Sequence, residues 1–284
     1  MSEWVIGIIG GSGLYGIDAL DDPQWIALDT PWGPPSDELL TGRIDGIRFV
    51  FLPRHGRGHR IGPSQINYCA NVDAMKRAGC TDLIAISAIG SLREELAPGR
   101  FVVVDQFIDR TVARESSFFG AGLVAHVSMA DPVCPRLSAL AADAVEAAGA
   151  QVARAGTYVA IEGPQFSTRA ESALYRSWGC DVIGMTGMPE AKLAREAGLP
   201  YALIGMVTDY DCWRAGEEAQ VAAIVARLQA NAGTAKRLIV ELALALPKER
   251  PPSPIDTALA EAIVTAPEAR DPAMAAKLEA ILKP

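Results

Sequence analysis

Short runs rich in valine, isoleucine and leucine alternate along the chain with segments of helical periodicity, and this alternation constrains the fold most strongly. Apolar runs typical of buried strands lie at Trp4–Ile9, Ile47–Leu52, Leu83–Ile86, Phe101–Val104, Thr157–Ile161, Val182–Met185 and Tyr201–Val207. Helical patterns lie at Ser64–Ala78, Arg136–Ala148, Thr168–Trp178, Pro189–Ala197 and about Glu217 to Leu246. Strands that alternate with helices predict an α/β sandwich around one mostly buried sheet.

A proline-rich segment, Pro247–Pro254, ends this pattern, because proline lacks an amide hydrogen and disfavours helix in the residue before it. We therefore predict a main domain over residues 1–247 and a linker with a short helical tail over residues 248–284. Two short helices are expected in the tail, at Asp256–Thr265 and Asp271–Leu282. The second has an apolar face, formed by Met274, Leu278 and Ile281, so the tail should dock on the main domain or on a neighbouring subunit.

Composition excludes several classes of protein. The 284 residues carry 26 Lys+Arg and 34 Asp+Glu, a net charge of −8. This excess of acidic residues argues against a protein that binds nucleic acid or an anionic membrane surface. The apolar runs are too scattered for a membrane span. Five cysteines without a CxxC pair or a Cys/His cluster at ligand spacing predict reduced thiols, no metal site and a cytoplasmic protein. Any anionic ligand must therefore be held locally.

A glycine-rich loop, GSGLYG over residues 11–16, follows the first predicted strand and matches GxGxxG. A dinucleotide site would need a helix that opens at the third glycine, whereas the next residues are short, acidic and interrupted by Pro23. A strand-end turn without a ligand is a second interpretation. We favour a third, a backbone cradle for one phosphate assisted by the Ser12 hydroxyl.

A basic loop, FLPRHGRGHR over residues 51–60, holds three arginines and two of the three histidines of the chain. Arginine matches phosphate oxygens with two parallel donors, and histidine adds a donor whose charge can follow pH. A basic surface loop would explain the arginines alone. The pattern therefore favours an anion site that includes Arg54 and His55.

Polar side chains follow three predicted strands, where open α/β sheets bind ligands. Ser87 follows the third strand, and taken alone it is more typical of a strand-end cap. Thr186 follows the sixth strand, and Asp209 and Asp211 follow the seventh. In an extended segment these two carboxylates would point the same way, which suits one protonated acid acting beside another. A solvated acidic turn is the alternative.

Together these segments resemble the purine nucleoside phosphorylase superfamily, most closely its S-methyl-5′-thioadenosine phosphorylase branch. The resemblance runs from about Val5 to about Leu246. The motifs that carry it are IIGGSGLYG at Ile8, RHGRGHRIGPSQINYCAN at Arg54, SAIGSLREELAPG at Ser87, DQFIDRT at Asp105, IEGPQFSTRAES at Ile161, DVIGMTGMPEAKLAREAGLPYA at Asp181 and MVTDYDCW at Met206.

The resemblance implies a single-domain α/β/α sandwich around a central mixed sheet, assembled as a homotrimer or a dimer of trimers. It implies phosphate binding by Ser12, Arg54, His55, Ser87, Ala88 and Thr186. Met185 would then pack on the ribose, Phe166 on the base or sugar, and Asp209 and Asp211 would face the purine. His126 would reach the 5′-substituent pocket of a neighbouring subunit. Two further positions would tune specificity, Ser167 and Ala222, the latter smaller than is usual in the family.

The implied reaction is phosphorolysis of S-methyl-5′-thioadenosine to adenine and 5-methylthioribose 1-phosphate, in purine and methionine salvage, with phosphate as co-substrate and no cofactor. Protonated Asp209 would donate to purine N7, and aspartate rather than asparagine there favours a 6-aminopurine. The alternatives are a phosphorylase of 6-oxopurine nucleosides such as methylthioinosine or inosine, a water-using nucleosidase, an NAD-dependent oxidoreductase and a non-catalytic nucleoside sensor.

Overall fold

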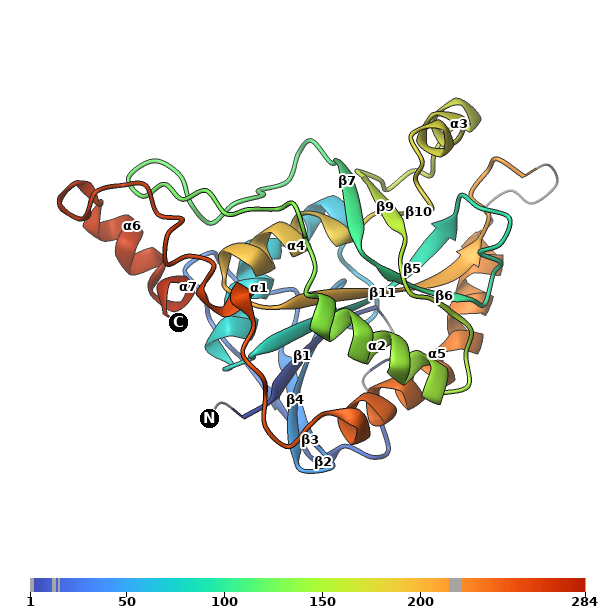
Figure 1. The fold of residues 1–284 in the computed structure, drawn as a ribbon, viewed down its shortest axis with the longest axis horizontal. Coiled ribbons are helices and arrows are strands. Elements are labelled where there is room, and N and C mark those ends of the chain that lie inside the picture. The colour runs from blue at the N-terminus through green and yellow to red at the C-terminus, as the bar shows by residue number, and fades with distance from the viewer. Residues whose placement is uncertain (1–2, 12–13, 15, 215–220, 284) are drawn as a thin grey trace.

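The computed structural model describes residues 3–11, 14, 16–214 and 221–283, which form one mixed sheet flanked by helices (Figure 1). The strands are β1 Val5–Gly10, β2 Asp21–Ile26, β3 Leu39–Ile44, β4 Ile47–Pro53, β5 Asp82–Ser91, β6 Phe101–Val104, β7 Gln106–Arg110, β8 Val152–Ala153, β9 Thr157–Ile161, β10 Val182–Gly184 and β11 Tyr201–Asp209. The helices are α1 Tyr68–Arg77, α2 Pro135–Ala147, α3 Arg169–Ser177, α4 Gly187–Glu196, α5 Val221–Ala245, α6 Pro272–Lys277 and α7 Glu279–Leu282.

The sheet branches at β5, and this branch places the candidate site. The main path runs β2-β3-β4-β1-β5-β10-β9-β7, while β11 pairs with β5 and β6, and β6 pairs with β8. Strands β4, β1, β5 and β11 are parallel, whereas β10 is antiparallel to β5. The carboxyl ends of four central strands therefore meet at one edge, next to the start of α4, which follows β10.

Helices cover both faces of the sheet, as the α/β/α prediction requires (Figure 1). One apolar cluster contains Val72 of α1 and Leu193 of α4, and the other contains Leu137 of α2 and Leu238 of α5. Helix α3 stands apart with a smaller cluster around Tyr175.

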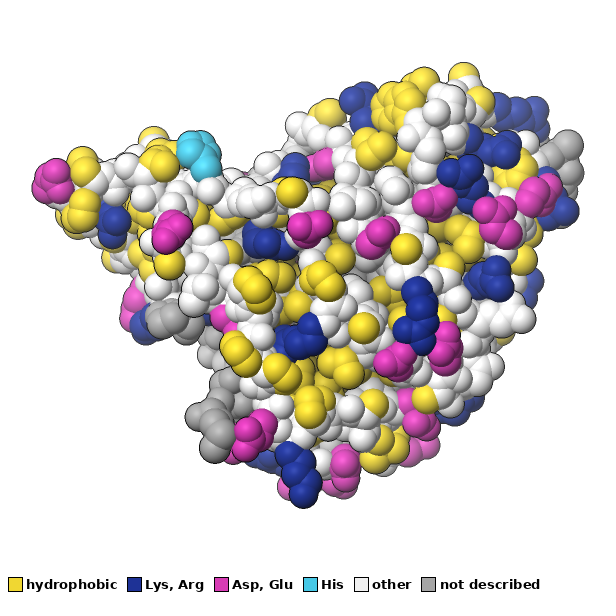
Figure 2. Space-filling view, in the orientation of Figure 1, with side chains coloured by type: hydrophobic (Ala, Val, Ile, Leu, Met, Phe, Trp, Pro, Cys, Tyr) yellow, Lys and Arg dark blue, Asp and Glu magenta, His cyan; other side chains and the backbone are white. Residues whose placement is uncertain are grey.

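None of the described helices has the length and apolarity that a membrane span needs. Acidic and basic side chains intermingle on the face shown in Figure 2.

The seven predicted strands are present, but the sequence patterns missed β2, β3, β7 and β8. Strand β2 is exposed along nearly its whole length, and β7 is mostly polar, so neither has a buried apolar run. The first helix begins later than predicted, because Asn67 caps it through Ala70 N and Pro63–Gln65 form a separate 3₁₀ turn. The predicted start of the last long helix, Glu217, lies outside the described residues.

The tail packs on the main domain, although one of its predicted helices is wrong. Asp256–Thr265 begins with a 3₁₀ turn and continues as turns up to Ile263, which forms a β-bridge with Ala125. Downstream, the expected helix is divided into α6 and α7, and Leu278 and Ile281 are buried in the same core as α1. The division at residue 247 stays a prediction.

Buried charges also hold the linker in place. Asp82, which is fully buried, accepts hydrogen bonds from Arg136 and from Arg250 Nε, the latter at 2.5 Å. Arg250 also pairs with Asp256 at 2.6 Å. Just before the linker, Trp4 Nε1 donates to the main-chain oxygen of Pro247 at 2.8 Å. The linker is thus joined to β5 by the contact between Arg250 and Asp82, in addition to the apolar burial of the tail.

Candidate active site

Two hydroxyl side chains meet where β5 passes the start of α4. Ser87 Oγ lies 3.1 Å from Thr186 Oγ1 and donates to the main-chain oxygen of Ala88 at 3.1 Å. Strand β5 continues to Ser91, and Ser87 pairs with Gly205 of β11. The interpretation of Ser87 as a strand-end cap is therefore wrong, because the strand runs on beyond it.

A buried tyrosine fixes the backbone of Thr186. The Tyr158 hydroxyl accepts from Thr186 N at 3.2 Å and from Gly187 N at 3.4 Å. Only glycine fits at position 184, because a Cβ there would lie 2.2 Å from the Tyr158 hydroxyl oxygen. The Thr186 hydroxyl is thus held next to Ser87, just before α4, whose backbone is non-helical at Met188.

Arg54 is a fully buried side chain at the end of β4, so a basic surface loop does not describe it. Its Nε and Nη2 donate to the Glu190 carboxylate at 2.8 and 3.0 Å. The remaining contacts are with the main-chain oxygens of Ile9 and Ile86, at 2.9 and 3.3 Å. Burial opposes the charge of Arg54, but the Glu190 carboxylate outweighs it and the pKa of Arg54 is raised.

His55 is neutral at neutral pH. Burial, together with the positive charge of Arg54, lowers its pKa to about 4. Its Nδ1 lies 2.9 Å from the main-chain oxygen of Ile61, and since a carbonyl only accepts, Nδ1 carries the hydrogen. The ring stacks on His59 with centroids 4.2 Å apart. His55 therefore presents Nε2 as a hydrogen-bond acceptor.

The two carboxylates at the end of β11 are held in a compact turn. Asp211 N donates to Asp209 Oδ1 at 2.8 Å, and Thr208 Oγ1 donates to Asp209 Oδ2 at 2.6 Å. Asp211 has φ +55°, so the expectation of an extended segment is wrong. Asp211 is 3% exposed, which argues against a solvated acidic turn. Burial raises the pKa of both acids, and the charge of Asp209 adds to the shift at Asp211.

Glycine makes room for Asp209 and for Met185. A Cβ on Gly90 would lie 3.2 Å from Asp209 Oδ1 and 2.9 Å from Ile183 Cγ2. Gly163 has φ +66°, and a Cβ there would lie 2.5 Å from Met185 Sδ. Both predicted contact residues therefore lie directly against glycine backbone.

The remaining predicted residues are spread more widely. Phe166 is 45% exposed, and the main-chain oxygen of Ser167 accepts from Cys212 Sγ at 3.2 Å, which joins this loop to the acidic turn. Ala222 is exposed on α5. Ser12 lies outside the described residues.

After Gly16 the next described element is β2 and not a helix, so the dinucleotide interpretation lacks the helix it requires.

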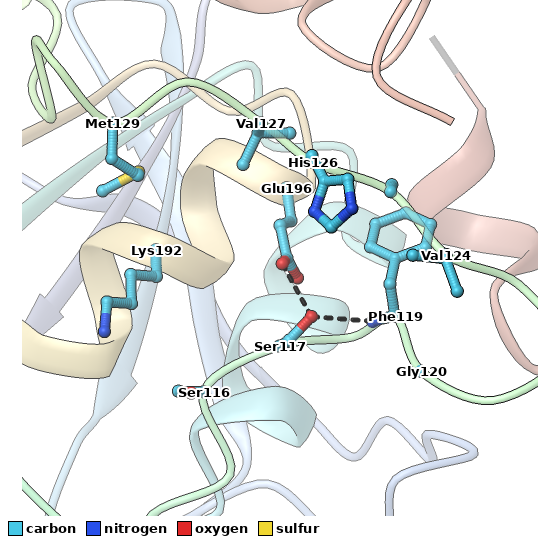
Figure 3. Close-up of a pocket in the computed structure, with 11 residues that line it drawn as sticks. Ser116, Ser117, Phe119, Gly120, Val124, His126, Val127, Met129, Lys192 and Glu196 are labelled. Carbon is cyan, nitrogen blue, oxygen red and sulfur yellow. Dashed lines mark hydrogen bonds between the residues drawn. The ribbon is translucent and has the colours of Figure 1, made fainter. Parts of the chain in front are cut away.

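His126 lies away from this cluster, on an exposed segment that lines a separate pocket of about 380 Å³. Phe119 and Glu196 line the same pocket, and Ser117 Oγ donates to Glu196 at 2.7 Å (Figure 3). The pocket does not include Ser87, Thr186 or Asp209. The segment is joined to the tail, because His126 N donates to the main-chain oxygen of Ala262 at 2.9 Å.

Sequence patterns did not single out Glu190, Tyr158 or Arg114, which surround the predicted site residues. Glu190 carried a usable signal, since it is an acid between apolar neighbours on a helix that directly follows a buried strand. Such a residue is rarely buried without a cationic partner. Tyr158 resembled an ordinary strand residue, and Arg114 lies in a segment without periodicity.

The fold and the polar groups described above define an α/β protein in which a hydroxyl pair on β5 and before α4, a buried arginine after β4 and an acid pair at the end of β11 belong to the central strands of one sheet. Residues 5–244 match the sequence profile of the phosphorylase superfamily. The S-methyl-5′-thioadenosine phosphorylase of Cereibacter sphaeroides is 58% identical over 280 residues, covering 98% of this chain and 97% of that protein. The protein of that name from Bradyrhizobium diazoefficiens is 56% identical, covering 99% and 98%.

Solved structures with a similar fold include phosphorylases of the same kind. A methylthioadenosine phosphorylase from an antarctic soil metagenomic library has a TM-score of 0.94 and 45% identity, with both chains fully covered. A variant of the adenosine/methylthioadenosine phosphorylase of Schistosoma mansoni in complex with methylthioadenosine has a TM-score of 0.83 and 37% identity, covering 87% of this chain and 93% of that one. The chain belongs to the phosphorylase superfamily, in its S-methyl-5′-thioadenosine phosphorylase branch.

Proposed function

We propose that this protein cleaves S-methyl-5′-thioadenosine with inorganic phosphate, releasing adenine and 5-methylthioribose 1-phosphate. The observation that carries the proposal is the hydroxyl pair Ser87–Thr186, next to buried Arg54 and on the same sheet edge as the Asp209 turn. Cleavage of an N-glycosidic bond needs an anionic nucleophile on one side of the sugar and an acid at the departing base. The relatives named above support this choice of substrate.

In this proposal phosphate binds to Ser87, the Ala88 backbone, Thr186, Arg54, His55 and Ser12. Contacts within the described residues take four of the five Arg54 N–H groups, which leaves one Nη1 hydrogen for an oxygen of phosphate. Neutral His55 accepts from the hydroxyl of hydrogen phosphate through Nε2. Because Glu190 neutralises Arg54, recognition depends on directed hydrogen bonds more than on net positive charge.

Asp209 is the proposed acid for the purine, with Asp211 beside it. Its raised pKa favours the protonated form that can donate to N7, while the other carboxyl oxygen can accept from a 6-amino group. Met185 contacts the ribose and Phe166 the base or sugar. Ser167 and Ala222 adjust the fit of the purine and of the 5′ group. Purine and methionine salvage is the corresponding physiological role.

The active enzyme is proposed to be a cytoplasmic homotrimer, or a dimer of such trimers. Support comes from His126, whose pocket excludes the phosphate cluster of its own subunit, so that His126 serves the 5′-substituent pocket of a neighbour. The main domain, residues 1–247, carries every assigned residue, His126 included. No cofactor is needed, because phosphate supplies the nucleophile.

Release of free base, measured with and without phosphate, tests the proposal on four nucleosides: methylthioadenosine, methylthioinosine, adenosine and inosine. We expect phosphate-dependent cleavage with methylthioadenosine preferred. Equal release without phosphate would indicate a nucleosidase, and preference for methylthioinosine or inosine would reverse the assignment of the base. Saturable binding without cleavage would indicate a sensor.

A further inference from the structure

Arg114 is a buried side chain that joins the two loops bordering the candidate site. Its side chain is 1% exposed. Its Nη1 donates to the main-chain oxygens of Met185 and Met188 at 2.5 and 2.7 Å, and its Nη2 donates to that of Glu162 at 2.7 Å. One guanidinium thus holds the turn between β10 and α4 against the segment that follows β9.

The peptide between Met185 and Thr186 is fixed at both of its polar atoms. Arg114 binds its oxygen, and the Tyr158 hydroxyl accepts from its N–H at 3.2 Å. This peptide connects the proposed ribose contact, Met185, to the proposed phosphate ligand, Thr186, whose hydroxyl lies 3.1 Å from Ser87. A rotation of the peptide would therefore displace both ligand groups together.

The charge of Arg114 is matched by the Glu162 carboxylate, 3.3 Å from its Nε. Burial alone would raise the pKa of Glu162, but hydrogen bonds from Ser64 and from the N–H groups of Val112 and Ala113, with the charge of Arg114, lower it to about 2. The carboxylate is therefore ionised at every working pH. Arginine suits this place because its planar fork offers five directed donors, whereas lysine offers three on a flexible stem.

We propose that Arg114 is a positioning residue that sets the ribose-binding and phosphate-binding groups relative to each other through the Met185–Thr186 peptide. The inference rests on the proposed phosphorolysis and goes beyond it, because Arg114 acts only through other residues. Small displacements of binding groups lower the rate steeply, with ~100-fold losses for shifts of about 1 Å.

The test compares Arg114→Met, Arg114→Lys and the native enzyme in phosphate-dependent cleavage of methylthioadenosine. We expect Arg114→Met to raise KM for phosphate and for the nucleoside together and to lower kcat/KM by about 100-fold, and Arg114→Lys to recover roughly a tenth of the native value. Arg136→Met is the matched control, because it removes another arginine bound to a buried acid, at Asp82. It should lower the urea midpoint and leave kcat and both KM values unchanged.

Tyr158→Phe removes the partner at the other end of the same peptide and keeps the test decisive if Arg114→Met does not fold. In a double-mutant cycle, the fold-loss of kcat/KM in the variant that carries both Arg114→Lys and Tyr158→Phe should be smaller than the product of the fold-losses of the two single variants. Native KM values in folded Arg114→Met, a rise in only one KM, or strict additivity in the cycle would overturn the inference. Failure of the native enzyme to cleave the nucleoside would instead overturn the proposed function.

Discussion

Replacing Glu190 with glutamine should destabilise the protein strongly, because it leaves the buried charge of Arg54 without a counter-ion. Both side chains are 1% exposed and share contacts at 2.8 and 3.0 Å. Glutamine keeps the shape and can still accept from the Tyr201 hydroxyl, which donates to Glu190 at 2.9 Å. The change therefore removes charge with little loss of packing.

Removing one partner of a buried ion pair costs about 3–5 kcal/mol. At about 2–4 °C per kcal/mol, the melting temperature should fall by roughly 6–20 °C. Removal of both charges in Arg54→Met/Glu190→Gln should restore most of this stability, since uncharged replacements of buried pairs are often neutral. The double variant should nevertheless cleave poorly, because it lacks the proposed phosphate ligand.

Urea unfolding followed by circular dichroism measures the free energy of unfolding in all three proteins. Glu279→Gln is the control, because its partner Lys283 is also an exposed side chain, 2.7 Å away, and such pairs contribute little. An unfolding midpoint for Glu190→Gln equal to that of the native protein would refute the reasoning. A double variant with the same low free energy of unfolding as Glu190→Gln would also refute it, because the loss of stability could then not be ascribed to the unpaired charge of Arg54.

Three further predictions concern the acid, its glycine neighbour and the tail. Asp209→Asn should lower kcat for methylthioadenosine by about 10²–10⁴-fold, and unchanged turnover would exclude the acid role. Because the pKa of Asp209 is raised, kcat of the native enzyme should fall as pH rises through that pKa. The pH profile of the variant should lack this decrease. Gly90→Ala places a methyl group 3.2 Å from Asp209 Oδ1 and should lower kcat by at least ~10-fold, whereas Gly233→Ala on α5, where the nearest neighbour is 3.8 Å away, should have native kinetics. Truncation after Pro247 removes the tail atom that His126 N binds, so amide exchange at His126 should accelerate; native exchange would show that the tail does not hold this segment.

Buried apolar runs predicted the centre of the sheet well and its margins poorly. The predicted strand at Thr157–Ile161 coincides with β9, because a strand covered on both faces must be continuously apolar. Strand β2 contains Asp21, Asp22 and Pro23 and is exposed. Its pairing with β3 comes from the backbone of its neighbour, which no local pattern in its own sequence reports.

The site was predicted as separate groups of residues and not as an arrangement. Strand ends, glycines and a basic loop pointed to Arg54, Ser87, Thr186 and Asp209 because each follows a recognisable buried run. The sequence gives no distances between them, so the burial of Arg54 against Glu190 was not foreseen. The extended arrangement expected for the two acids is wrong, since a hydrogen bond from Asp211 N to Asp209 closes a turn.

The sequence alone therefore determined the α/β class, the central strands and the chemical types of the side chains that follow the predicted apolar runs, because hydrophobic period and chain order are local properties. Tertiary structure decided which groups meet: it stacked His55 on His59, lowered the pKa of His55 to about 4, and buried Arg114 between loops distant in sequence. These outcomes depend on desolvation and on hydrogen bonds across the fold, which arise only when separate strands pack together.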